Sequence, residues 1–141
     1  MAGVTALECA LFIPDKGTTE DNIKKIAEAK LQESTVKERC DSLVKMYREV
    51  AVRKQPNQEL WRAAVEIAGD RMSNISTMET LKKCSERGAT TFFYVFDYYN
   101  PKTFGPFSEL IPSSEAFHCS ELAYVFNSGV TAPFEFCDHD K

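Results

Sequence analysis

The residues best suited to proton-transfer chemistry in this sequence are its two histidines, His118 and His139. Histidine is the side chain that most readily exchanges a proton near neutral pH. His118 follows an aromatic, β-branched stretch and a loop rich in Pro, Gly and Ser, whereas His139 stands in the polar tail Cys-Asp-His-Asp. We therefore favour His118 as a catalytic candidate and expect His139 to be solvated.

Cysteines near these histidines could support two other kinds of chemistry. Cys119, Cys137 and the two histidines are acceptable zinc ligands, but their spacing matches no common zinc site. As a nucleophile, Cys119 would need an identified base and an oxyanion hole, so a role in loop packing is expected instead. We predict no metal site and no cofactor. The five cysteines form no CxxC pair, and the redox compartment stays open.

Four helices are expected to position these residues. The first begins near residues 18–21, whose acids favour a helix N-terminus, and the second follows a capping box made by Thr35 and Glu38. The third ends near Gly69, and the fourth spans 75–86 and stops at Gly88. The residues expected to face inward are Ile23, Ile26, Ala27 and Leu31, then Val36, Cys40, Leu43, Val44 and Tyr47, then Leu60, Ala64, Val65, Ile67 and Ala68.

The stretch TTFFYVFDYY, from Thr90 to Tyr99, is typical of a strand buried on both faces in a mostly parallel sheet. A loop over 101–114 and a short helical or extended segment over 120–126 follow it. A parallel sheet needs several such strands, and the sequence offers one strong strand and one weak apolar opening from Gly3 to Ile13. This imbalance indicates part of a domain, with an incomplete sheet.

Two segments resemble the carboxylesterase/cholinesterase type of α/β-hydrolase. HCSELAYVF, beginning at His118, is similar to the segment that carries that family's catalytic histidine. GVTALECALF, beginning at Gly3, is similar to the loop that carries the family's triad acid, here Glu8. The order acid then histidine, and the interval between them, also agree with the family. Leu7, Cys9 and Asn127 depart from its pattern.

The resemblance implies an α/β fold in which residues 1–141 are the C-terminal portion of a single α/β-hydrolase domain: the last strands of a mostly parallel sheet plus a helical segment. It implies a serine esterase with a Ser-His-Glu triad acting on a small ester. In this role Glu8 accepts the imidazole N–H of His118, fixes its tautomer and stabilises the imidazolium.

The nucleophile of such a triad is missing from this chain. The nucleophile elbow is Gly-x-Ser-x-Gly, and no two of the six glycines are four residues apart. We therefore expect no ester hydrolysis by this chain alone. Two alternatives stay open. One is a non-catalytic binding, adhesion or partner-interaction module that uses the exposed sheet edge. The other is an incomplete gene model whose true start lies upstream.

Composition excludes some partners and leaves others open. A net charge of −4 and a pI near 5.3 give no reason to expect nucleic acid. No apolar run approaches the roughly 20 residues of a membrane span, and the opening lacks the basic start of a signal peptide, so the location is left open. A glycosylation sequon begins at Asn74.

Three aromatic residues near the histidine segment are expected to line a pocket: Phe104, Phe107 and Phe117. Three other large apolar residues are expected in the helix core: Trp61, Met72 and Met78.

Overall fold

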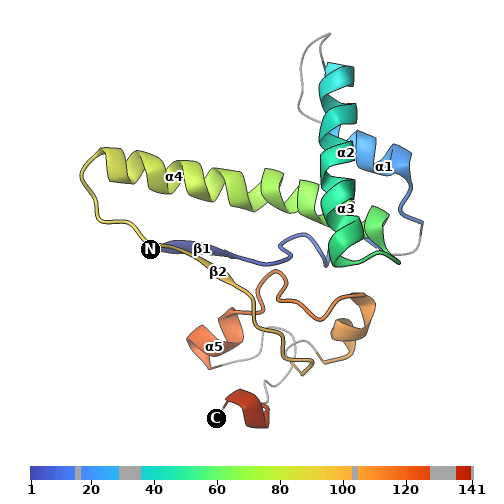
Figure 1. The fold of residues 1–141 in the computed structure, drawn as a ribbon. Coiled ribbons are helices and arrows are strands. Elements are labelled where there is room, and N and C mark those ends of the chain that lie inside the picture. Colours follow the sequence, from blue (N-terminus) through green and yellow to red (C-terminus); the bar gives the residue numbers. More distant parts are fainter. Residues whose placement is uncertain (15–16, 29–35, 103–104, 128–135, 141) are drawn as a thin grey trace.

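The computed structural model describes residues 1–14, 17–28, 36–102, 105–127 and 136–140, with the side chains of 36–38 and 106–108 left aside. A body of three packed helices lies at one end of the molecule, as Figure 1 shows. A fourth helix and a small sheet extend from this body side by side, and the C-terminal segments lie on the other side of the sheet.

The helical body consists of α1 (Glu20–Glu28), α2 (Val36–Lys54) and α3 (Glu59–Gly69). Most of the apolar residues expected from the 3.6-residue period meet in one cluster, which confirms those helices, while Val65 and Ala68 are buried in the neighbouring cluster of Leu7 and Phe117. Leu31 and Thr35 lie outside the described residues. The buried members of the cluster are Ile23, Ala27, Cys40, Val44, Ala51, Ala63, Ala64 and Ile67.

The third and fourth helices form one rod. After Gly69 the backbone stays helical through the π turn Asp70–Asn74 and continues as α4 (Ile75–Glu86). The end expected near Gly69 is therefore a change from α to π hydrogen bonding, not a break. At Gly88, where φ is +85°, the rod stops as expected. The N–H groups of Gly88 and Ala89 close it by donating to the carbonyls of Ser85 and Cys84.

Of the three residues on this rod that were expected in the core, one is buried and two are exposed. Trp61 is 1% exposed, and its indole N–H donates to the Ile13 carbonyl at 2.8 Å, so its assignment to the core is confirmed. Met72 and Met78 are 68% and 57% exposed, so the expectation that they are core residues is wrong. Met72 lies in the π turn and Met78 in α4, and Figure 1 shows α4 extending away from the α1–α3 body.

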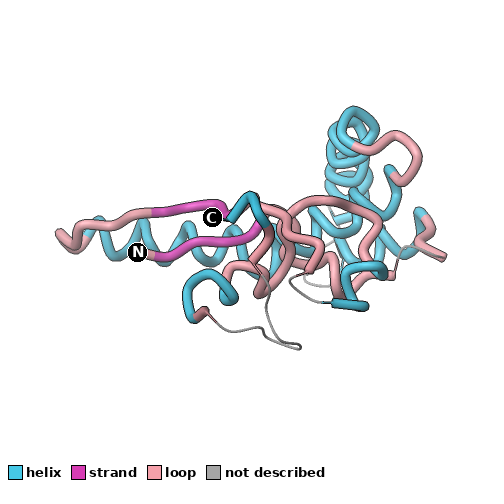
Figure 2. Tube along the Cα trace, turned by 90° about the horizontal axis from the view of Figure 1, so that it is seen from below, coloured by secondary structure: helices cyan, strands magenta, loops and turns pink. Residues whose placement is uncertain are grey.

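The sheet has two parallel strands in the described part of the chain, β1 (Ala2–Thr5) and β2 (Phe93–Phe96). Their register pairs Ala2 with Phe93 and Thr5 with Phe96. Parallel strands need a long crossover, and all four helices lie in the connection between these two. Figure 2 shows the strands side by side with α4 running along one face. The chain is thus mixed helix and parallel strand, compatible with a partial α/β fold.

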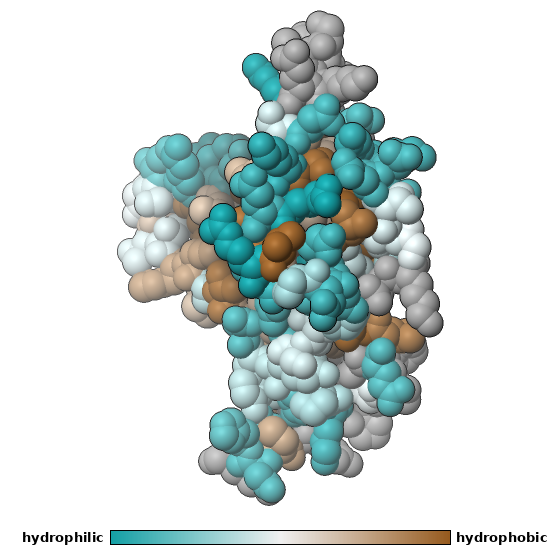
Figure 3. Space-filling model, turned by 45° about the vertical axis from the view of Figure 1, so that its right-hand side comes forward, coloured by the Kyte–Doolittle hydropathy of each residue, from teal (hydrophilic) through white to brown (hydrophobic). Residues whose placement is uncertain are grey.

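The expectation that the aromatic strand is buried on both faces is wrong. Phe93, Tyr94 and Val95 are 43%, 39% and 55% exposed, and the strand covers four residues of the ten expected. A strand becomes buried only when neighbours cover both its edges and its faces. Within the described residues β2 has one strand neighbour, so its side chains stay open to solvent. Figure 3 shows apolar patches among hydrophilic residues on one face of the molecule.

The C-terminal part contains the short helix α5 (Leu122–Phe126) and the 3₁₀ turns Gly105–Leu110 and Asp138–Asp140. Of the two forms expected for 120–126, helical or extended, the helical one is present, over a shorter range. It ends at Asn127 with φ +50°, a left-handed conformation that asparagine tolerates better than most residues. No described helix is both long enough and apolar enough to cross a membrane.

Candidate active site

The segment after β1, called here the acid loop (residues 6–13), lies against the segment that leads to His118. Leu7 and Phe117 form a parallel bridge, and the Leu7 N–H donates to the carbonyl of Ala116 at 2.8 Å. Both side chains are 1% exposed and belong to the same core cluster. Backbone bonding and apolar packing therefore fix these two segments together.

Glu8 and His118 are in direct contact, although 110 residues separate them in the chain. Glu8 Oε2 lies 2.7 Å from His118 Nδ1, and Oε1 accepts the Thr5 N–H at 2.6 Å. The carboxylate is 8% exposed, so both of its oxygens are committed in a largely buried setting. The structure thus brings together the two residues that the sequence selects.

This contact sets the proton arrangement on the imidazole. An ionised carboxylate can only accept, so Nδ1 must carry the hydrogen that it accepts, and the lone pair of the neutral ring is on Nε2. The His118 side chain is 45% exposed, which leaves the ring accessible. The Phe12 ring packs against it at a centroid distance of 5.8 Å and an interplanar angle of 55°. The imidazole is therefore oriented on one edge and supported on one side.

Cys119, next to His118, has an uncommon backbone conformation and a side chain that packs inward. Its φ is +68°, in the left-handed region that is uncommon for a residue with a side chain. The side chain packs against the core cluster that contains Leu7 and Phe117, as expected for loop packing. Burial, together with the charges of Glu121 and Glu8, raises the pKa of the thiol, so it stays protonated and weakly nucleophilic at neutral pH.

His139 lies in the exposed 3₁₀ turn at the C-terminus, as expected for a solvated residue. The neighbouring Cys137 contacts the hydroxyl of Tyr98 at 3.5 Å. In the described parts of the chain no group of three or more His, Cys, Asp or Glu side chains is arranged to hold a metal ion. All five cysteines are unpaired.

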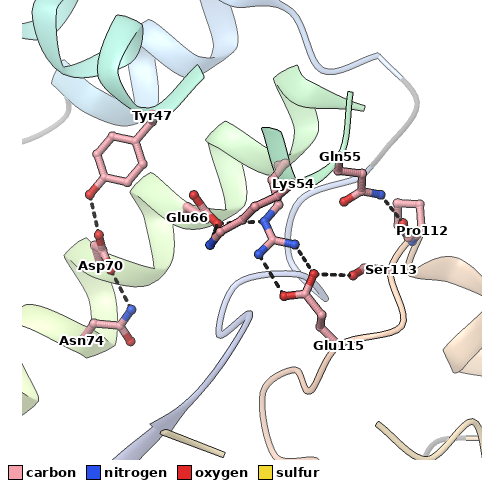
Figure 4. Close-up of polar contacts among 10 residues, drawn as sticks. Tyr47, Lys54, Gln55, Glu66, Asp70, Asn74, Pro112, Ser113 and Glu115 are labelled. Carbon is pink, nitrogen blue, oxygen red and sulfur yellow. Dashed lines mark hydrogen bonds and ion pairs between the residues drawn. The ribbon is translucent and has the colours of Figure 1, made fainter. Parts of the chain in front are cut away.

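A buried arginine joins α3 to the histidine segment. The Arg62 side chain is 2% exposed, and its guanidinium forms a two-pronged pair with Glu115, with Nη2 to Oε2 at 2.9 Å. Arg62 Nε also donates to Glu66 Oε1 at 2.8 Å, and Lys54 reaches the same oxygen at 2.9 Å. Ser113 Oγ donates to Glu115 Oε1 at 3.2 Å, as Figure 4 shows.

Charge balance explains why this arginine is tolerated inside the protein. Two cations, Arg62 and Lys54, meet two carboxylates, Glu66 and Glu115. The hydrogen bond from Arg62 holds the pKa of the Glu115 carboxyl below its usual range, against the opposing effect of partial burial. These residues do not stand out in the sequence as candidates for a site. Their signal was an arginine that stands between Trp61 and the apolar run Ala63–Val65.

A second cluster of hydrogen-bonded polar side chains shares a cavity with Glu8. The Tyr47 hydroxyl donates to Asp70 Oδ2, and Asn74 Nδ2 donates to Asp70 Oδ1 at 2.7 Å (Figure 4). Burial and the bond to Asp70 raise the pKa of the Tyr47 hydroxyl. These three side chains and Glu8 line a cavity of about 250 Å³. The Asn74 nitrogen that a glycan would need is therefore already engaged.

An apolar groove of about 480 Å³ opens beside the Phe12 that supports His118. Phe12 and Met72 contribute to its walls. Of the aromatic residues expected to line a pocket here, Phe117 is instead buried in the core, because the bridge to Leu7 turns it inward. Phe104 and the side chain of Phe107 lie outside the described part of the structure.

Comparison with known proteins gives one family match and one curated relative. The family model described as "Carboxylesterase family" matches residues 1–141. The chain is 29% identical over 139 residues to Esterase cest-33 of Caenorhabditis elegans, a match covering 99% of this chain and 22% of that protein. It therefore spans about a fifth of the length of this curated relative. No solved structure gave a significant match.

Proposed function

Because this chain belongs to the carboxylesterase family, we propose that it supplies the acid and the histidine of an ester-hydrolysing Ser-His-Glu triad. The observation that carries this proposal is the 2.7 Å contact between Glu8 Oε2 and His118 Nδ1. These are the two residues at which the sequence resembles the family's acid and histidine segments. In this proposal residues 1–141 form the C-terminal portion of one α/β-hydrolase domain.

The proposed chemistry follows from the orientation of the imidazole. A serine from outside this chain attacks the ester carbonyl, and His118 Nε2 takes the serine proton as a general base. Glu8 keeps Nδ1 protonated and stabilises the imidazolium that forms. His118 then donates the proton to the leaving alcohol, and water repeats the sequence to release the acid. No cofactor takes part in these steps.

The chain by itself is proposed to be inactive on esters. It contains no Gly-x-Ser-x-Gly turn for the nucleophile, and the glycine-rich loop that supplies oxyanion donors is also missing from its sequence. With a chromogenic ester, the expected rate equals that of the buffer. Turnover that disappears in the variant His118→Ala would contradict this expectation.

A chimera tests the positive part of the proposal. The 139-residue stretch of Esterase cest-33 that matches this chain is replaced by this chain, and ester hydrolysis is measured. Activity should fall by about 10⁴-fold or more in Glu8→Ala and in His118→Ala, the scale seen when a triad member is removed. His139→Ala, on the exposed tail, is the matched control and should retain activity. A folded chimera in which Glu8→Ala or His118→Ala keeps its activity contradicts the assignment.

The exposure of β2 favours a second candidate, a non-catalytic module that binds a protein partner along this strand. Val95 is 55% exposed at the centre of β2, next to the exposed Phe93 and Tyr94. Exposed apolar strands of this kind associate readily. Size-exclusion chromatography over a range of concentrations tests it. Association that Val95→Lys abolishes supports the module, and a monomer at every concentration opposes it.

A further inference from the structure

The acid loop and the histidine segment are both anchored to the same face of α3. Gly69, at the end of α3, lies against the acid loop, where a Cβ built on it would be 3.6 Å from Glu8 Cβ. Arg62 lies about two turns earlier on the same helix, and two whole turns return a residue to the same face. There its guanidinium holds Glu115, three residues before His118. One face of α3 therefore contacts both the acid loop that carries Glu8 and the segment that carries His118.

From this arrangement we propose that Arg62 and Glu115 are positioning residues, which set His118 at hydrogen-bonding distance from Glu8. The proposal rests on the proposed function above, since it assigns a task to that same pair. The fork between a guanidinium and a carboxylate makes two parallel hydrogen bonds and so restrains direction as well as distance. A single apolar contact would restrain distance alone.

The short span between Glu115 and His118 makes this restraint effective. The intervening segment is fixed a second time, because the Ala116 carbonyl accepts the Leu7 N–H and Phe117 is buried. Gln55, just beyond the end of α2, adds a hold three residues before Glu115 by donating to the Pro112 carbonyl (Figure 4). The imidazole therefore extends from a segment tied to α2, α3 and the acid loop, and Glu115 is its only charged anchor among these contacts.

The readout is the tautomer of His118, measured by two-bond ¹H–¹⁵N correlation spectra at a pH where imidazoles are neutral. The parent chain carries His139→Gln, which leaves His118 as its one imidazole. We expect the Nδ1–H tautomer to dominate in this parent. Glu8→Gln should shift the tautomer ratio by about tenfold or more, because a hydrogen bond to a charged acceptor is lost.

The decisive variant replaces the charged fork by an apolar pair, Arg62→Met with Glu115→Leu. Such a replacement leaves no unpaired buried charge at either position, so folding is expected to survive, as circular dichroism and a melting curve would check. We expect the Nδ1–H preference to fall by about the same tenfold, because the direction of the loop is no longer set. Arg62→Lys, which keeps the charge but loses the fork, should give a partial loss.

Two controls separate positioning from general stability. Lys54→Met breaks the bond to Glu66 but leaves the Arg62–Glu115 fork in place, and it should keep the parent tautomer. Val44→Ala weakens the core between α1, α2 and α3 and should also keep it in the folded state. If the apolar pair does not fold, Glu115→Gln, which preserves shape and removes the charge, is measured in its place.

The outcomes are distinguishable. A parent chain without the Nδ1–H form, and unchanged by Glu8→Gln, contradicts the proposed function itself. A parent with that form, lost in Glu8→Gln but retained in the folded apolar pair, contradicts the positioning role alone. Loss in the apolar pair together with retention in Lys54→Met supports it.

Discussion

Leu7 and Phe117 face each other across a parallel bridge, and Glu8 and His118 are the next residues on the two segments. Equal steps along two parallel segments keep their side chains in register. The bridge therefore determines that the carboxylate and the imidazole meet, while the burial of Leu7 and Phe117 holds the bridge in place.

The Glu8 carboxylate should contribute to stability as well as to the orientation of His118. In Glu8→Ala the buried Thr5 loses the acceptor of its N–H, which bonds Oε1 at 2.6 Å. We expect a loss of about 1–3 kcal/mol in the free energy of unfolding, the usual cost of an unsatisfied buried donor. Urea denaturation measures it. Glu8→Gln retains an acceptor and should lose less, and equal losses in both variants would contradict this account.

Two glycines on the α3–α4 rod should respond in opposite directions to alanine. At Gly69 the backbone is ordinary α-helix and the new Cβ finds van der Waals contact, so Gly69→Ala should stabilise by about 0.5–1 kcal/mol. Gly88 has φ +85°, which disfavours any side chain, and Gly88→Ala should destabilise by about 1 kcal/mol. Melting curves under identical conditions compare the two. The same direction of change in both would be inconsistent with this backbone geometry.

Acid should weaken the Arg62–Glu115 fork. The folded protein holds the pKa of Glu115 below its unfolded value, which is about 4.3 for glutamate. The contribution of this pair is therefore fully present above the unfolded pKa and is lost as pH falls through the lower folded value. Glu115→Gln should flatten the acid side of a stability–pH curve measured with urea. Glu79→Gln, an exposed carboxylate on α4, is the control and should leave that slope unchanged.

The C-terminal turn should depend on Asp140. Its carboxylate accepts from the Tyr124 hydroxyl at 3.0 Å, from Asn100 Nδ2 at 3.1 Å and from the Cys137 N–H at 2.5 Å. Burial and the bond to Asp140 raise the pKa of Tyr124 to about 12. In Asp140→Ala, amide hydrogen exchange at residues 137–140 should become faster while the α1–α3 body is unchanged. His139→Ala is the control, and equal exchange in both variants would show that Asp140 does not hold the turn.

Much of the helical architecture could be read from periodicity and end signals. Apolar residues at helical spacing located α1, α2 and α3, and Gly88 marked the end of α4 because few other residues adopt its φ. These signals are local, so they are visible without knowledge of the partner surfaces. Met72 and Met78 were misassigned because burial depends on what lies opposite a helix face, which periodicity does not report.

The pairing of Glu8 with His118 was anticipated through the likeness of two short segments to a known family, not through any property of the intervening chain. The supports of that pair were not anticipated. Arg62 and Glu115 are separated by 53 residues, and nothing in either neighbourhood specifies the other. Phe117 had been expected beside a pocket and lies in the core, since register with Leu7 turned it inward.

The sequence by itself determined the helices, the parallel crossover, the two residues suited to acid–base chemistry and the lack of a nucleophile elbow. The helices, the crossover and the missing elbow depend on residue type and on spacing along the chain, whereas the pair Glu8 and His118 was selected by the resemblance of two segments to a known family. Only the tertiary structure decided that Nδ1 of His118 meets Glu8, that Arg62 reaches the histidine segment, and that β2 is exposed. Those relationships depend on long-range register and on which surfaces pack together, because burial and hydrogen bonding are set by neighbours in space.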